Sequence, residues 1–395
     1  MIHLRHALAA AAAALAIAGC SQAPPEPDPT ISTDNIANFQ EMVRFENFTL
    51  GFFAFDTIVI RDQAGRSFIY DEAARSTEGP YGTVLIREGF SLTAEPQNQE
   101  FAYTADGGVA CRPTFDEAKQ VLVPITEPDP IAVFIDQNVP FDAANIPAVT
   151  YNLTTCEELV ELTLATLSLI NLDDGKTVLV DDNATDMFIP TDLTTGEEGE
   201  PQTVYYEPSP DGSLQVSAYT GYEEDREVTI RNATTGEEET LSIQATARAW
   251  APTSEQIFLR QEFLDQLLYD IDTGETLELP GYSSILPAPD GTYTALFPVT
   301  PPDTPIAVVD VADLAIIWQS SDPGFIPQNW ANEEVLGIAN RRDAIVRLVN
   351  VASGDVLAEY EGANFVTFNT LGGRDRMMLS FENEVILYRI VADGG

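Results

Sequence analysis

A short phrase that recurs about every 40 residues constrains this chain more than any other feature. Its clearest copy is LYDIDTGETLEL, Leu268 to Leu279, which reads as a strand, a tight Thr-Gly turn and a second strand. Each copy carries Asn or Asp four residues before the turn residue: Asn152, Asp192, Asn232, Asp270, Asp310 and Asn350, at intervals of 40, 40, 38, 40 and 40 residues. Strand pairs and glycine turns repeated at this period are typical of the blades of a β-propeller.

A second turn lies between these copies and completes the blade. Its clearest forms are Ser209-Pro-Asp-Gly212 and Ala288-Pro-Asp-Gly291, where proline and glycine supply the fixed and the permissive backbone angles of a turn. The stretch from Glu157 to Ile170 has a composition that would also suit a helix. The repeat frame and its alternating leucines predict strands there instead, so each unit is a four-stranded meander.

The number of blades follows from the chain that remains after the N-terminal region. About 345 residues at a period near 40 favour eight blades, and seven remain possible if the early region is irregular. Three strands are expected near the C-terminus, and we expect the fourth strand of that blade from Phe48 to Phe55, because pairing the two termini removes exposed edges. The stretch from Asp136 to Pro147 has the length of an insertion that would project from one face, and ordinary variation in loop length is the alternative explanation.

The first 40 residues are predicted to be outside the propeller. A basic start is followed by an apolar run of about a dozen residues, from Ala7 to Ala18, which is too short to span a bilayer and typical of a secretory signal. We therefore expect a lipoprotein signal peptide at 1–19, a Pro-rich tether at 20–40 and the propeller at 41–395.

The end of the signal carries a recognisable processing motif. Ile17-Ala18-Gly19-Cys20 resembles the bacterial lipobox, and this resemblance implies that Cys20 is diacylated (a palmitate-type anchor) and becomes the mature N-terminus. Ser21 after the cysteine resembles the outer-membrane sorting pattern of hosts with two membranes. The expected location is therefore extracytoplasmic, lipid-anchored to the cell envelope, and the outer membrane in such a host.

Charge excludes one class of partner. The chain has 63 acidic and 19 basic residues, a formal net charge of −44, and this field repels the phosphate backbone of nucleic acids. Lys119 and Lys176 are its only lysines. Both an adaptation to salt, in which cations screen the repulsion, and an acidic lineage composition are compatible with this balance.

Histidine is missing after the signal, since the two copies are His3 and His6. This removes Ser-His-Asp and Cys-His catalysis and metal sites built on imidazole, so we predict a protein that is not an enzyme and holds no cofactor or metal. A glycosidase that uses two carboxylates stays open as an alternative.

Two further sets of residues have predicted structural roles. Cys111 and Cys156 are the only thiols after Cys20, and in an oxidising compartment we expect them to form a disulfide. The six Asn and Asp residues of the repeat are expected to hydrogen-bond the backbone of their own turns rather than a ligand.

The Ser-Pro-Asp-Gly and Asp-x-x-Thr-Gly turns resemble those of TolB-type and WD40-like propellers, over roughly Tyr151 to Val391. The Gly-His dipeptide and the Trp-Asp pair of true WD40 blades are absent, so TolB is the better comparison. This resemblance implies a binding disc. We therefore expect a membrane-anchored envelope lipoprotein that is a non-enzymatic platform for another envelope protein or a cell-wall component; the alternative is a carboxylate-based carbohydrate-active enzyme or lectin.

Overall fold

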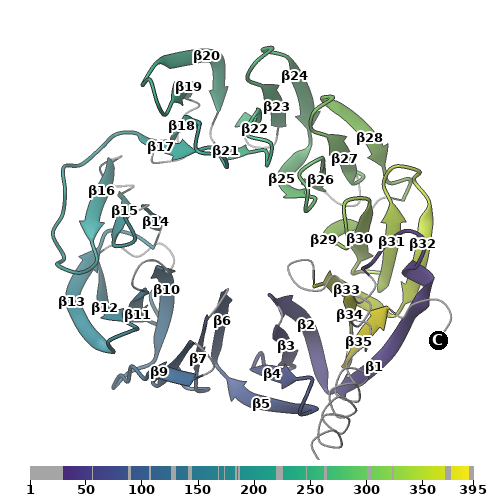
Figure 1. The fold of residues 1–395 in the computed structure, drawn as a ribbon, viewed down its shortest axis with the longest axis horizontal. Coiled ribbons are helices and arrows are strands. Elements are labelled where there is room, and N and C mark those ends of the chain that lie inside the picture. Colours follow the sequence, from purple (N-terminus) through teal and green to yellow (C-terminus); the bar gives the residue numbers. More distant parts are fainter. Residues whose placement is uncertain are drawn as a thin grey trace, which may run out of the picture.

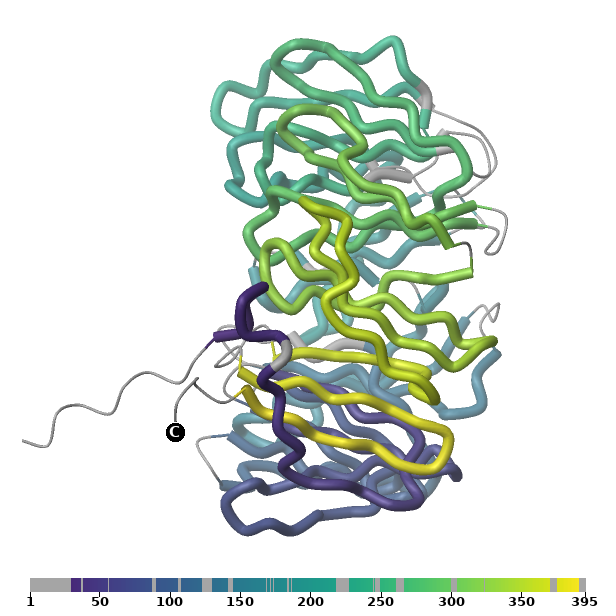
Figure 2. Tube along the Cα trace, turned by 90° about the vertical axis from the view of Figure 1, so that its right-hand side faces the viewer, coloured from purple at the N-terminus to yellow at the C-terminus, as the bar shows by residue number. Residues whose placement is uncertain are grey.

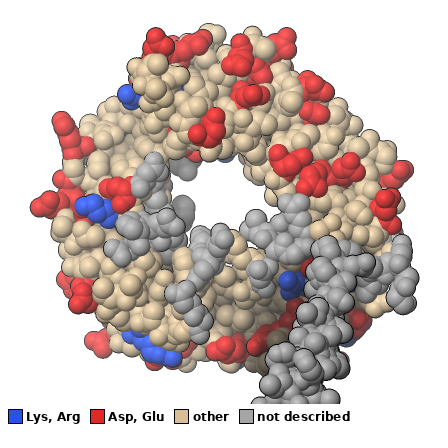
Figure 3. Space-filling view, viewed as in Figure 1, with Lys and Arg blue, Asp and Glu red and all other residues tan. Residues whose placement is uncertain are grey.

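The computed structural model is a ring of nine antiparallel sheets around a central opening (Figures 1 and 3). It describes residues 30–390 apart from internal gaps at 56, 88–89, 106–107, 126–129, 141–144, 168, 173, 183–184, 186, 219–225, 246, 262–264, 300–303, 323 and 370–374. The fold is therefore an all-β propeller, as the repeat predicts. Predictions for residues 1–29, including the signal peptide and Cys20, lie outside the described residues.

The first half of the ring contains blades 1 to 4. Blade 1 contains β2 (Phe48–Ala54), β3 (Thr57–Asp62), β4 (Ser67–Asp71) and β5 (Ser76–Tyr81); blade 2 contains β6 (Thr83–Arg87), β7 (Phe90–Ala94), β8 (Phe101–Ala105) and β9 (Gly108–Cys111); blade 3 contains β10 (Lys119–Ile125), β11 (Ile131–Asp136), β12 (Ile146–Asn152) and β13 (Glu157–Leu164); blade 4 contains β14 (Leu169–Asn171), β15 (Thr177–Asp182) and β16 (Met187–Asp192). In blade 4 the place of a fourth strand is taken by residues 197–202, which form two isolated bridges with β16.

The second half of the ring is more regular. Blade 5 contains β17 (Tyr205–Pro208), β18 (Leu214–Ala218), β19 (Arg226–Asn232) and β20 (Glu238–Ala245); blade 6 contains β21 (Ala247–Trp250), β22 (Gln256–Gln261), β23 (Asp265–Asp270) and β24 (Thr276–Pro280); blade 7 contains β25 (Tyr282–Pro287), β26 (Tyr293–Pro298), β27 (Ala307–Asp310) and β28 (Ala315–Gln319); blade 8 contains β29 (Ile326–Trp330), β30 (Val335–Asn340), β31 (Ile345–Asn350) and β32 (Val356–Glu361). Glu157–Leu164 is a strand, as the repeat frame predicts.

Strands from both ends of the chain close the ring. Blade 9 contains β33 (Ala363–Phe368), β34 (Arg376–Phe381) and β35 (Glu384–Ile390), and β1 (Phe39–Glu46) is its outermost strand, paired antiparallel with β35. Pairing of the two ends is confirmed, but the strand that does it is β1. The segment we expected, Phe48 to Phe55, supplies β2 instead, the innermost strand of blade 1.

An ion-pair network reinforces this closure. Arg376 Nη1 on β34 contacts Glu72 Oε2 of blade 1 at 2.7 Å, and its guanidinium lies over the ring of Phe53 on β2. Asp375, only 3% exposed, accepts a hydrogen bond from Arg389 Nε at 2.7 Å. Blades 9 and 1 are therefore joined by charged contacts as well as by apolar packing.

The prediction of eight or seven blades is wrong, because there are nine. The error arises in the early region, where the repeat could not be phased. Blades 1 and 2, at Phe48–Tyr81 and Thr83–Cys111, are each shorter than the 40-residue period, so two blades occupy chain that the period assigns to fewer. Their turns also lack the Asn/Asp-Thr-Gly signature that marks the later blades.

The apolar core lies between neighbouring blades. One buried cluster joins blades 2 and 3 through Phe101 and Phe134, whose ring centroids are 4.9 Å apart. Another joins blades 8 and 9, and it includes Ile31 and Ile36, which are 3% and 4% exposed. The end of the expected tether is thus packed against the propeller, where η1 (Ile36–Asn38) contacts β32. No helix among the described residues is long and apolar enough to cross a membrane.

Candidate functional site

The meander gives the disc two unlike faces. Because successive strands run in opposite directions, the turns after the first and third strands of each blade lie on one face, which we call the turn face; residues 153–156 of blade 3 are an example. The loops after the second strands and the links between blades lie on the other, the connector face. In blade 3 this face carries residues 137–140, which follow β11, and the link 112–118.

The turn face is uniform across blades 3 to 8, because one set of contacts recurs in each of them. The repeat Asn and Asp side chains accept hydrogen bonds from backbone N–H groups two or three residues ahead, as at Asn152 from Thr154 and Thr155, both at 2.9 Å. The same acceptor role is found at Asp192, Asn232, Asp270, Asp310 and Asn350. These side chains are engaged in their own turns.

A second recurring hydrogen bond ties the two turns of each blade together. The residue after each repeat Asn or Asp donates its backbone N–H to the carbonyl of the other turn of the same blade. The donor–acceptor pairs are Leu153–Pro130, Leu193–Lys176, Ala233–Ser213, Ile271–Glu255, Val311–Thr292 and Val351–Glu334. The turn face is therefore fixed by its backbone, with little freedom to vary in shape.

The N-terminal segment arrives on this same face. Phe39, the first residue of β1, pairs with Ile390, the last residue of β35, so residues 30–38 continue beyond the turn side of blade 9. Asn332 Nδ2, in a turn of blade 8, donates to Ile31 O at 2.9 Å. Figure 2 shows this segment, in purple, on one side of the disc. Figure 3 views that side and shows carboxylates spread around the ring with few basic groups.

The connector half of the disc contains three cavities lined by described residues. The largest, about 530 Å³, lies between blades 2 and 3; a second, about 320 Å³, lies between blades 1 and 2; a third, about 220 Å³, lies between blades 6 and 7. Strand ends on the connector side line all three, such as Lys119 and Pro147 in the first, Tyr81 and Glu100 in the second and Arg260 and Gln266 in the third.

The largest cavity, which we call the Lys119 groove, follows from unequal strand lengths. Its blade 3 wall is the long hairpin of β12 and β13, whereas the outer strand of blade 2, β9, has only four residues. Phe115 of the link between the blades and Phe134 of β11 form an aromatic floor with ring centroids 4.9 Å apart. Pro147, at the end of the predicted insertion, lines its rim.

Charge in the Lys119 groove is predominantly acidic. Glu158 and Glu161 project from β13 into it, and both are exposed. Lys119 pairs in register with Asp136 at the start of β10, and its ammonium makes no ion pair within the described part of the chain. Tyr151 donates to Glu158 Oε2 at 3.1 Å, and burial, followed by this hydrogen bond, raises the pKa of the Tyr151 phenol.

The groove lacks the geometry that the glycosidase alternative needs. Inverting and retaining glycosidases place two carboxyl groups on opposite sides of the scissile bond. Glu158 and Glu161 instead lie on one side of a single strand. No group of three or more His, Cys, Asp or Glu side chains suited to a metal ion occurs among residues 30–390 outside the gaps.

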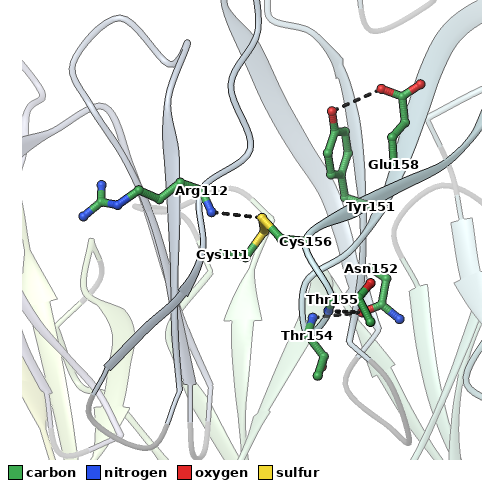
Figure 4. Close-up of a disulfide and its surroundings, with 8 residues drawn as sticks. All are labelled: Cys111, Arg112, Tyr151, Asn152, Thr154, Thr155, Cys156 and Glu158. Carbon is green, nitrogen blue, oxygen red and sulfur yellow. Dashed lines mark hydrogen bonds between the residues drawn. A yellow bond between two sulfur atoms is a disulfide. The ribbon is translucent and has the colours of Figure 1, made fainter.

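A disulfide joins the two blades beside the groove (Figure 4). The sulfur atoms of Cys111 on β9 and Cys156 in the β12–β13 turn are 2.10 Å apart, and the Cα atoms 5.0 Å. Arg112 N donates to Cys156 Sγ at 3.2 Å. Cys156 has a φ of 59°, where the corresponding turns have Gly196, Gly236 and Gly274; the bond holds this residue in a backbone region that favours glycine.

Comparisons with solved structures find distant similarities. The C-terminal WD40 domain of Sif2 matches with a TM-score of 0.47 and 10% identity, covering 90% of this chain and 99% of that one. The computationally designed Ika8 protein matches at 0.44 and 11%, covering 89% and 100%. BamB from Moraxella catarrhalis matches at 0.43 and 10%, again covering 89% and 100%. No protein-family model and no curated protein sequence matches.

Sequence reasoning found the turn residues and missed the cavities. Asp136 to Pro147 was expected to project from one face; its two ends belong to β11 and β12, and residues 141–144 lie outside the described residues. Glu158, Glu161, Arg260 and Gln266 carry no local signal, since the cavities that they line form only where neighbouring blades pack together. The one available hint was the rarity of lysine, which singles out Lys119 and Lys176; the second of these pairs with Asp192 on the turn face at 3.1 Å.

Proposed function

We propose that this chain is a membrane-anchored envelope lipoprotein that performs no chemistry and binds another envelope protein through its connector face. The observation that carries the proposal is the contrast between the two faces. The turn face repeats one set of backbone hydrogen bonds in blades 3 to 8, whereas the three cavities lie toward the connector face, where β11 ends and β12 begins. Rigid scaffolds commonly carry their binding residues on such variable loops.

The attachment of the N-terminal segment suits this orientation. Residues 30–38 lie on the turn face, held by Ile31 and Ile36, so the lipid on Cys20 would be tethered from that face. The connector face would then point away from the membrane to which the chain is attached. An acylated Cys20 and a short proline-rich tether would leave that face accessible to a partner in the same envelope compartment.

The partner's surface should be basic where it meets the Lys119 groove. Glu158 and Glu161 outnumber the single ammonium of Lys119, and Phe115 and Phe134 provide an aromatic floor. An arginine or lysine side chain placed there would contact carboxylates and a ring face together. The net charge of −44 would also accelerate its approach at low salt.

The test compares two variants that remove the same charge, one from the groove and one from the exposed turns. Glu158→Gln with Glu161→Gln changes the groove, and Glu237→Gln with Glu275→Gln changes exposed turn-face residues. After chemical cross-linking in envelope preparations, the turn-face variant should retain the proteins that wild type captures and the groove variant should lose one of them. Replacing residues 140–144 by a Gly-Ser segment of equal length should weaken the same capture with little change in melting temperature. Equal capture by all variants would refute the assignment to this face.

The anchor has its own test. Cys20→Ala should not be acylated and should leave the membrane fraction, whereas the wild type should remain in it after a salt wash. Equal membrane retention of both proteins would contradict lipid anchoring while leaving the binding face untouched.

A further inference from the structure

A small cavity between blades 6 and 7 has a chemistry unlike the rest of this acidic molecule. It occupies about 220 Å³ on the connector side, close to the innermost strands β21 and β25. Its described polar lining is Arg260, Gln266, Ser283 and Ser284, and its apolar walls include Phe258 and Ile285. No Asp or Glu is among the described residues that line it.

Gln266 brings an unpaired hydrogen-bond acceptor to this cavity. The side chain is 7% exposed, and its Oε1 has no hydrogen-bond partner. A buried acceptor without a donor is unfavourable, because it has lost its water without gaining a replacement. The site therefore calls for a group that brings an N–H or O–H to Oε1.

Arg260 lies next to this acceptor. It pairs directly with Gln266 across β22 and β23, so both side chains emerge on the same side of the sheet, which is the side that Phe258 and Leu268 turn toward blade 7. Arg260 already makes a contact within the protein. A guanidinium has five N–H donors in a planar fork, so it can keep that contact and still bind a carboxylate through two donors.

The opposite wall is shaped by an irregularity in β25. The register of β25 against β26 shifts between Tyr282 and Ser284, which leaves Ser283 as an additional residue at the cavity, where two small exposed serines form part of the lining. Ala249, also small, faces them from β21. Space remains here because small residues stand where larger ones would close the gap between the blades.

We propose that this cavity binds a carboxylate whose neighbouring atom bears an N–H donor and an apolar side chain. Such a group is the C-terminal residue of a peptide or a free apolar amino acid. Its carboxylate would bond Arg260 and a serine hydroxyl, its N–H would donate to Gln266 Oε1, and its side chain would pack against Phe258 and Ile285.

The volume fits a group of that size. About 220 Å³ is well above the ~10–15 Å³ of probe volume that one water needs and below the ~300–1,000 Å³ typical of drug-sized ligand sites. Water alone could satisfy Gln266 Oε1, but the test separates this occupant from the proposed one. The site does not depend on the protein partner proposed above, since it lies between a different pair of blades.

The experiment titrates the full mature chain with four probes by calorimetry, at a salt concentration that screens the protein's field. The probes are N-acetyl-alanyl-leucine, its C-terminal amide, its variant methylated on the leucine nitrogen, and free leucine. The first should bind, and the amide and the N-methyl peptide should each bind at least about tenfold more weakly. Tighter binding of free leucine than of the peptide would identify the amino acid as the ligand, and the reverse would identify a peptide terminus.

Three variants locate the binding. Arg260→Met should weaken the binding of N-acetyl-alanyl-leucine at least about tenfold, a change of about 1.4 kcal/mol in binding free energy. Gln266→Leu should weaken it equally while keeping the side-chain volume. Because Gln266→Leu removes an unpaired buried acceptor, its melting temperature should not fall, which separates lost binding from lost folding. The control Arg112→Met, in the cavity between blades 1 and 2, should leave the affinity unchanged. Equal binding of acid and amide, equal loss in all three variants, or a crystal soaked with the peptide that shows only water in the cavity would overturn the proposal.

Discussion

At the scale of single residues, the repeat depends on one acceptor atom that Asn and Asp both supply. Three copies carry asparagine (Asn152, Asn232 and Asn350) and three carry aspartate, and each places an Oδ1 against the backbone N–H groups of its own turn. The glycine that ends the turn matters equally. Gly354 has a φ of 79°, and a Cβ there would lie 3.3 Å from the ring of Trp318 in the neighbouring blade.

The first prediction tests whether the acceptor or the charge is important in these turns. Asn350 Oδ1 accepts from Ala352 N and Ser353 N, both at 2.9 Å. Asn350→Ala should lower the free energy of unfolding by about 1–2 kcal/mol, because both N–H groups lose their partner. Asn350→Asp should stay within about 0.5 kcal/mol of wild type. Urea unfolding of the three proteins measures this, and equal losses in both variants would contradict it.

The second prediction concerns the pH dependence of one such turn. Burial acts to raise the pKa of Asp192, but the Thr194 hydroxyl and backbone N–H and the Lys176 ammonium outweigh it and lower the pKa to about 2. Because the unfolded value is about 3.9, the ionised side chain stabilises the fold fully above about pH 4, and this contribution is lost as the pH falls toward 2.

Asp192→Asn removes the charge and keeps the acceptor, as in the turns that already carry Asn. At pH 7 the wild type should therefore melt at a slightly higher temperature than the variant. The difference in free energy of unfolding should be less than about 1 kcal/mol, because the ion pair is largely solvated. The difference should shrink between about pH 4 and pH 2. Calorimetric melting of both proteins across this range checks the effect, and a gap that widens in acid would exclude it.

At the scale of elements, the sequence predicts the strands where Asn, Asp and Gly residues mark the turns, and it does not where these residues are missing. From Tyr151 onward the Asn/Asp and Gly positions mark each hairpin, and strands such as β23 and β31 lie where the repeat puts them. In blades 1 and 2 these markers are missing, and the turn after β4 is capped by Asp71 through a bond to Ala74 N at 2.9 Å. The period therefore undercounts the blades.

The candidate sites are harder to predict because no single element contains one. The Lys119 groove needs β10, β12 and β13 of one blade and the link that follows β9 of another. The cavity at Gln266 needs a register shift in β25, which no local pattern reveals. Spacing along the chain fixes neighbours within a blade, whereas these sites depend on contacts between blades.

The third prediction concerns the segment that precedes β1. Ile36 is 4% exposed and packs with the core shared by blades 8 and 9, so Ile36→Ala should lower the free energy of unfolding by about 2–4 kcal/mol through lost burial and the remaining cavity. Met42→Ala, on β1 but 41% exposed, is the control and should cost much less. Chemical denaturation compares them. Similar small losses in both would show that the segment is not an integral part of the ring.

At the scale of the whole molecule, the two faces of the disc differ in structure. The turn face receives the N-terminal segment and repeats one set of hydrogen bonds, while the connector face carries the cavities between blades. Closure stabilises the ring, since β1 pairs with β35 over Phe39–Glu46 and leaves no unpaired edge between the first and last blades. Loops on one face can therefore vary while the scaffold that positions them stays unchanged.

The fourth prediction follows from the net charge, which is also a property of the whole molecule. With 63 acidic and 19 basic residues, carboxylates crowd the surface and repel one another, and compact folding brings them closer than in the unfolded chain. Salt shortens the Debye length from about 10 Å at 0.1 M to about 3 Å at 1 M, so the melting temperature should rise between these concentrations of sodium chloride. Sodium sulfate strengthens apolar burial as well, so chloride is the salt to use. A melting temperature that does not change with chloride would mean that the carboxylates are far enough apart to be solvated separately. The acidic composition would then not destabilise the fold.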